Sequence, residues 1–179
     1  DGTTNFMHGI PHFAISIAHV QNEQVEAGMV YDPTRDETFW ATRGGGCFLN
    51  NKRLRVSARR SLNTAILATG IPFGDRSGKE EMLSALVPVM HKTAGLRRFG
   101  AASLDLAYIA AGRFDAFWEI GLSPWDVAAG ILMVQEAGGF VSELNGQNDP
   151  LNGGTILAAN SALFNPVGKM LREAIDFGT

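Results

Sequence analysis

The stretch Ser123-Pro124-Trp125-Asp126-Val127-Ala128-Ala129-Gly130 contains the residues of a helix start. Serine is a favoured cap, proline fits the first helical position, and an aspartate in the first turn complements the helix dipole. The apolar residues Val127, Ile131 and Val134 step by four and then three positions, which is the period of one helical face. We therefore expect a helix here that ends at Gly138-Gly139.

Three other segments predict helices. One expected helical face carries Met82, Leu83, Leu86, Val89 and Met90, with Ser77 as the expected cap. Pro88 inside this pattern predicts a kink or an early end. Residues 101–111 form a second helix that stops at a glycine. Asn165-Pro166, a cap followed by proline, opens a closing helix to about Ile175.

Strands are expected on both sides of these helices. In residues 12–18 the large apolar side chains Phe13, Ile15 and Ile17 alternate, which predicts a strand with one buried face. The other expected strands are residues 25–31, 37–42, 47–49, 52–56, 114–120, 140–144 and 155–159. An antiparallel region followed by strands that alternate with helices predicts a layered α/β (α+β) fold.

Composition sets the broad class of the protein. With 179 residues, 45% hydrophobic and 18% charged, the chain suits a single globular domain, residues 1–179, and not a disordered tail. No apolar run approaches the roughly 18–20 residues that span a bilayer, and the first six residues do not resemble a signal peptide. One cysteine, Cys47, favours a reducing compartment and hence the cytoplasm; it is interpreted as a buried apolar residue, not a catalytic thiol.

The net charge of −3 argues against broad affinity for nucleic acid, which needs a basic surface. An anionic substrate would therefore need a local binding device. Two stretches offer one.

Asp1-Gly2-Thr3-Thr4-Asn5 has two readings: an Asx turn or helix cap, or a phosphate cradle in which glycine permits close backbone approach and successive N–H groups point at an anion. Asp126 also has two readings, a carboxylate that only complements the helix dipole and a metal ligand. Trp125, taken by itself, is expected in the core.

Together the two stretches are more specific. Asp-Gly-Thr-Thr-Asn-Phe from Asp1, followed over a hundred residues later by Pro-Trp-Asp-Val-Ala-Ala-Gly, resembles the paired signatures of the inositol monophosphatase family. The resemblance implies the alternating helix and sheet layers of the inositol monophosphatase and fructose bisphosphatase type. Other segments that look like the family are residues 28–33, the glycine-rich hairpin through residues 54–57, residues 100–108 and residues 156–160.

The resemblance implies roles for individual residues. Asp1 and Asp126 match two magnesium ligands, and Asp1 and Thr3 are the expected catalytic residues, with the Thr3 hydroxyl placing the attacking water. Gly2 and Thr3 match the backbone N–H groups that hold the substrate phosphate. Magnesium prefers oxygen ligands, so the aspartates suit it, and the four histidines are interpreted as structural or exposed.

Two further matches concern the substrate. Glu119, seven residues before Asp126, matches an acid that hydrogen-bonds a substrate hydroxyl; the alternative is a solvated carboxylate at a strand end. Ala102 matches a backbone contact to the same substrate, and the alternative is an ordinary alanine at a helix start.

The match begins inside the first motif. The family's upstream Asp-Pro pair and a metal-binding glutamate have no counterpart, so the chain is expected to be a fragment of a longer gene product, with an inactive remnant as the alternative. We expect these 179 residues to lack useful activity alone. An amino-terminal helical pair would also be missing, which would leave apolar sheet surface uncovered.

The implied activity is magnesium-dependent, lithium-sensitive hydrolysis of a phosphate monoester, foremost inositol monophosphate, by a homodimer that binds a small phosphorylated polyol and no membrane. Relatives that act on fructose bisphosphate, adenosine bisphosphates or histidinol phosphate share the same metal motifs. Some bacterial members act instead in RNA polymerase or ribosome-associated regulation, and this alternative stays open.

Overall fold

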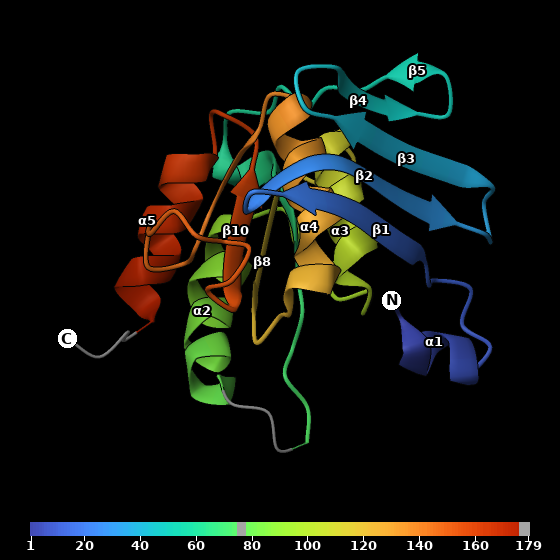
Figure 1. Ribbon diagram of the computed structural model, residues 1–179. Helices are drawn as coiled ribbons and strands as arrows, with labels where there is room; N and C mark the ends of the chain where they lie inside the picture. The colour runs from blue at the N-terminus through green and yellow to red at the C-terminus, as the bar shows by residue number, and fades with distance from the viewer. Residues whose placement is uncertain (75–77, 176–179) are drawn as a thin grey trace.

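The computed structural model describes residues 1–74 and 78–175. Within these residues the strands form two five-stranded sheets (Figure 1). The first sheet is antiparallel, in the order β1-β2-β3-β4-β5, and consists of β1 (Ile15–Gln21), β2 (Gln24–Asp32), β3 (Glu37–Thr42), β4 (Gly46–Leu49) and β5 (Lys52–Arg53).

The second sheet is mixed and has the order β7-β6-β8-β10-β9. β6 is parallel to β7 and β8, whereas β10 is antiparallel to β8 and β9. Its strands are β6 (Ile66–Thr69), β7 (Gly95–Arg97), β8 (Ala116–Ile120), β9 (Phe140–Ser142) and β10 (Thr155–Ala159). The described helices are α1 (Thr3–Met7), α2 (Lys79–Lys92), α3 (Ala102–Ala110), α4 (Pro124–Glu136) and α5 (Phe164–Ala174), with a 3₁₀ turn at Leu62–Thr64.

Helices and sheets alternate in layers. α3 and α4 lie between the two sheets, while α2 and α5 cover the outer face of the second sheet (Figure 1). Side chains of β8 show this directly: Phe117 belongs to the core cluster of α3 and α4, and Trp118, on the opposite face, belongs to the cluster of α2 and α5. The expected layered α/β fold is confirmed.

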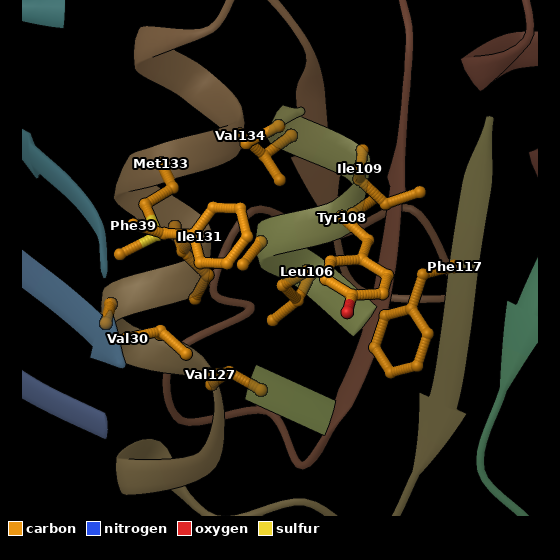
Figure 2. Close-up of a cluster of buried hydrophobic side chains, with 14 of the residues drawn as sticks. Val30, Phe39, Leu106, Tyr108, Ile109, Phe117, Val127, Ile131, Met133 and Val134 are labelled. Carbon is orange, nitrogen blue, oxygen red and sulfur yellow. The ribbon is translucent and has the colours of Figure 1, made fainter. Parts of the chain in front are cut away.

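The central core lies between the first sheet and the two inner helices. Figure 2 shows Val30 and Phe39 of that sheet facing α4, with Leu106 and Ile109 of α3 behind it. Every residue of α3 is buried, because the helix is covered on all sides. Small residues permit this close packing: a Cβ at Gly130 of α4 would stand 2.5 Å from the Cβ of Leu106.

The structure corrects the predicted face of the first strand. Ile15 and Ile17 are 54% and 56% exposed, and the smaller side chains of Ala14 and Ala18 pack into the core instead. The period of two was correct, but small residues face the core at this position because α4 lies close behind the sheet. Trp125 was also wrongly placed in the core: it is 74% exposed, because the buried side of α4 begins at Val127.

The expected ends and faces of the other helices differ in part. α2 continues past Pro88 to Lys92, and its buried residues are Met82, Ala85 and Val89. Leu83 and Met90 are exposed, so they were assigned to the wrong face. Ser77 lies outside the described residues. α5 begins before Asn165-Pro166, and its first turn is preceded by Asn160, whose side-chain oxygen accepts the N–H of Leu163.

Cys47 is fully buried in β4, as predicted, and burial raises the pKa of its thiol to about 12. In the described part of the chain, no helix is long and apolar enough to cross a membrane.

Candidate active site

The first residues of the chain form a tight turn into α1. Gly2 has φ +79°, and a Cβ there would stand 2.9 Å from the backbone oxygen of His12 and 2.9 Å from the Cα of Phe13, so this position requires glycine. The N–H of Phe6 donates to the Gly2 oxygen and closes the first helical turn. The N–H groups of Thr3 and Thr4 precede this bond and have no acceptor within the helix, which leaves them available for an anion.

The carboxylate of Asp1 joins this turn to α3. Its Oδ2 accepts the backbone N–H of Ser103 at 2.8 Å and the Ser103 hydroxyl at 2.7 Å, and its Oδ1 accepts the N–H of Gly2 at 2.8 Å. Because Ser103 lies in the first turn of α3, next to Ala102, the Asp1 carboxylate sits at the positive end of that helix dipole. The Gly2 N–H, expected to bind phosphate, is therefore already bonded to Asp1 in this structure.

Asn5 fixes the same turn from behind. Its buried side-chain amide donates to the backbone oxygens of His12 and Phe99, each at 2.8 Å. Phe99 lies just before α3, so Asn5 ties the candidate phosphate cradle to the helix start that Asp1 also contacts. The bond to Phe99 joins segments 94 residues apart and the bond to His12 is local, and together they hold the turn in one orientation.

Asp126 lies in the first turn of α4, half-buried, with its Oδ2 accepting the N–H of Ser123 at 2.9 Å. α3 and α4 run in the same direction side by side: in Figure 2, Val127 and Leu106 lie toward one end and Val134 and Ile109 toward the other. Both helix starts therefore lie at the same end, where Figure 1 also places the N-terminus. The structure thus brings Asp1 to α3 and places Asp126 at the adjacent helix start.

Glu119 lies near the end of β8, the strand that leads into α4. Its half-buried carboxyl group lies over Gly70, so a Cβ at Gly70 would require the Glu119 side chain to move. It faces Asp105, one turn into α3 from Ala102. The candidate substrate residues are therefore on neighbouring elements at the end of the domain that holds the two helix starts.

Asp105 is a charged residue type in an apolar setting. It is 1% exposed, and its Oδ1 has no hydrogen-bond partner among the described residues. Burial raises the pKa of Asp105 well above its ordinary value; the negative charge of Glu119 adds to the rise, and Arg98 opposes it.

These side chains fit part of a metal site. Carboxylate oxygens are suitable ligands for magnesium, which retains several waters and is commonly held by one or two carboxylates together with substrate phosphate. The described residues contain no group of three or more His, Cys, Asp or Glu side chains that could hold a metal ion. The carboxylates of Asp1 and Asp126 have the chemistry of magnesium ligands, and they are the candidates that the described residues offer at the two helix starts.

The histidines are not part of this group. His8, His19 and His91 are exposed. His12 is buried against the rings of Phe99 and Tyr108. Burial lowers the pKa of His12, Arg35 lowers it further, and Asp32 opposes the shift.

Sequence reasoning missed Ser103 and Asp105 as members of the site. Both lie inside the segment 100–108 that was noted for its family likeness. A serine and an aspartate inside an otherwise apolar, wholly buried helix were the available signal, because buried polar groups need partners.

The sequence pattern of the inositol monophosphatase family matches residues 1–175, and the chain belongs to this family. It is 53% identical to "Inositol-1-monophosphatase" of Caulobacter vibrioides over 97% of this chain and 69% of that protein. It is 55% identical to "Nus factor SuhB" of Pseudomonas aeruginosa over 92% of this chain and 61% of that protein. The chain thus spans about two thirds of the length of these relatives.

Solved structures agree. The crystal structure of the extragenic suppressor protein suhB from Bartonella henselae matches with a TM-score of 0.94 and 50% identity, over 98% of this chain and 67% of that one. Inositol monophosphatase from Anabaena matches with a TM-score of 0.89 and 34% identity, over 99% of this chain and 70% of that one. Members of the family are generally metal-dependent.

Proposed function

We propose that the protein hydrolyses phosphate monoesters with a magnesium ion that Asp1 and Asp126 help to hold. The observation that carries this proposal is the bond between Asp1 and the start of α3, beside the start of α4 where Asp126 lies. When bound, such an ion neutralises phosphate charge and lowers the pKa of a water molecule that it holds.

The residues of the chain would bind and orient the substrate. The free N–H groups at the start of α1 would donate to phosphate oxygens, and the positive end of the helix dipole would favour the anion. The Thr3 side chain is exposed, so its hydroxyl is accessible to hold the attacking water in line. Binding phosphate at Gly2 as well would require its N–H to leave Asp1.

We infer that the substrate is a polyol phosphate, foremost inositol monophosphate. A carboxylate at Glu119 would accept a hydrogen bond from a ring hydroxyl, and the backbone of Ala102 would make a second contact. The names of several relatives support this choice. Fructose bisphosphate, adenosine bisphosphates and histidinol phosphate are the alternatives for a side-by-side assay.

Substitution of Asp126 by asparagine in the full-length protein tests the activity. The amide keeps an acceptor for Ser123 N–H but loses the negative charge, so we expect the fold to remain and turnover to fall by about 100-fold or more. Asp36→Asn, at a turn away from the helix starts, is the matched control and is expected to keep wild-type turnover. Wild-type turnover in excess chelator, or in the Asp126→Asn protein, would contradict the proposal. Lithium is expected to inhibit.

A regulatory role is the second candidate, because the chain is as similar to a relative named Nus factor SuhB as to one named inositol-1-monophosphatase. The same Asp126→Asn substitution separates the two roles. A cellular phenotype lost together with hydrolysis supports the enzyme. A phenotype that survives the loss of hydrolysis supports the regulatory protein.

We also propose that the protein is a cytoplasmic homodimer in which each subunit has a single phosphatase domain. The single, buried Cys47 suits a reducing compartment. Light scattering of the purified protein measures the mass of the assembly, and a monomer at micromolar concentration would contradict this part of the proposal.

A further inference from the structure

We propose that Ser103 is a positioning residue, which fixes the carboxylate of Asp1 and so sets the affinity of the site for its divalent metal ion. This inference rests on the proposed function. It concerns a residue that is not expected to contact the substrate or the metal ion itself, but acts through Asp1.

Hydrogen bonds to both oxygens hold the plane of the Asp1 carboxylate in one orientation. Two donors of Ser103, the N–H at 2.8 Å and the hydroxyl at 2.7 Å, converge on Oδ2 of Asp1, and Gly2 donates to Oδ1 at 2.8 Å. A carboxylate has about four acceptor sites on its two oxygens. Three are used, so the plane of the group is fixed and the remaining site, on Oδ1, is the one open to a cation.

Burial strengthens this restraint. Ser103 is 0% exposed, and its hydroxyl has Asp1 as its acceptor across 102 residues of sequence. The bond itself is part-buried, because Asp1 is exposed, and a hydrogen bond to a charged acceptor is stronger than one to a neutral acceptor. The carboxylate is therefore held in one orientation, and less free energy is needed to order it when a metal ion binds.

A purely structural role would give a different result. The N–H of Ser103 lies in the first turn of α3 and has no acceptor within the helix. Asp1 would accept this N–H whatever side chain stood at position 103. The hydroxyl is not needed for that cap. Ser103→Ala keeps the N–H bond and removes the hydroxyl bond alone, so it separates capping of the helix from orientation of the ligand.

The experiment measures metal binding directly. We expect Ser103→Ala in the full-length protein to weaken Mg²⁺ and Mn²⁺ binding by about 10-fold or more in titration calorimetry. The metal concentration for half-maximal activity should rise equally, while the substrate KM at saturating metal stays near the wild-type value. Ser142→Ala, another buried serine whose hydroxyl donates to a backbone oxygen, is the matched control and should leave metal affinity unchanged.

A second variant covers a failure to fold. Ser103→Cys keeps a side chain of similar shape but offers a weak donor, so it should lose metal affinity in the same direction without leaving a cavity. Unchanged metal affinity in folded Ser103→Ala or Ser103→Cys, while Asp126→Asn weakens binding, would overturn the role of Ser103 alone. Unchanged metal affinity in Asp126→Asn would instead overturn the proposed function.

Discussion

Gly28 of β2 lies directly against Ala129 of α4: a Cβ at Gly28 would stand 2.8 Å from the Cα of Ala129. The strand and the helix can approach this closely because Gly28 has no side chain and Ala129 has only a methyl group, whose Cβ would stand 3.0 Å from the added atom. α4 also carries Asp126 in its first turn, so the position of this candidate ligand depends on how near the helix lies to the first sheet.

Gly28→Ala is expected to destabilise the fold by about 1–3 kcal/mol, because the added methyl group must displace backbone that has no free direction to move. Urea unfolding followed by circular dichroism measures the change. Gly95→Ala is the matched control: its new Cβ would meet only the flexible end of the Arg97 side chain, so little loss is expected. Equal stability of the two variants would show that α4 can move away from β2 without cost.

Glu119→Gln is expected to raise the KM for inositol monophosphate by about 10- to 100-fold. This factor corresponds to the free energy of one hydrogen bond to a charged group. A phosphate ester without ring hydroxyls, such as an aryl phosphate, should show little change, because it offers nothing for Glu119 to accept. Glu173→Gln, on the exposed side of α5, is the control. A loss that is equal for both substrates would assign Glu119 to the fold and not to substrate choice.

Asp105→Asn is expected to make the protein more stable relative to the wild type as the pH rises. The folded state raises the pKa of Asp105 above its ordinary value of 3.8, so it holds the proton more tightly than the unfolded chain does. Its contribution to stability is full below pH 3.8 and is lost as the pH rises through the raised pKa. Asparagine does not titrate. Urea unfolding of both proteins from pH 4 upward should therefore show curves that diverge in favour of the variant, whereas parallel curves would contradict the raised pKa.

His12→Leu is expected to reduce the loss of folding stability as the pH falls below neutral. Burial lowers the pKa of His12 from 6.5, so its neutral form is favoured in the folded state and the unfolded chain takes up a proton first. The stability that results is present above pH 6.5 and is lost as the pH falls toward the lowered value. Leucine keeps the contact with Phe99 and Tyr108 and has no proton to bind. The variant should lose less stability than the wild type between pH 7 and pH 5, and equal losses in the two proteins would contradict the lowered pKa of His12.

Local signals in the sequence predicted the elements well. The cap, proline and first-turn aspartate at Ser123–Asp126 located the start of α4, because helix capping depends on neighbouring residues alone. The face of β1 could not be predicted in this way. A period of two gives alternation but not which side meets α4, and close helix packing there selects Ala14 and Ala18 over the larger isoleucines.

The same limit applies to the site. The Asp1 and Asp126 motifs could be found by their likeness to a family, but the bond between Asp1 and Ser103 joins residues 102 positions apart. The helical period places Ser103 on α3 without showing what lies opposite it. Asp105 is similar: its raised pKa comes from burial and from Glu119 on a different element, and neither is visible in the residues beside it.

Because Cys47 is buried, the rate at which its thiol reacts can be used to measure local opening of the folded protein. Cys47 is the one cysteine in the sequence, it lies in β4 with no exposed surface, and its thiol has a pKa of about 12. The thiolate that reacts with alkylating or disulfide reagents is therefore both scarce and shielded in the folded state. Each molecule can be labelled once, when β4 separates from β3 and exposes the thiol. The rate of mass increase in a thiol reagent therefore follows the opening of the first sheet without any added probe.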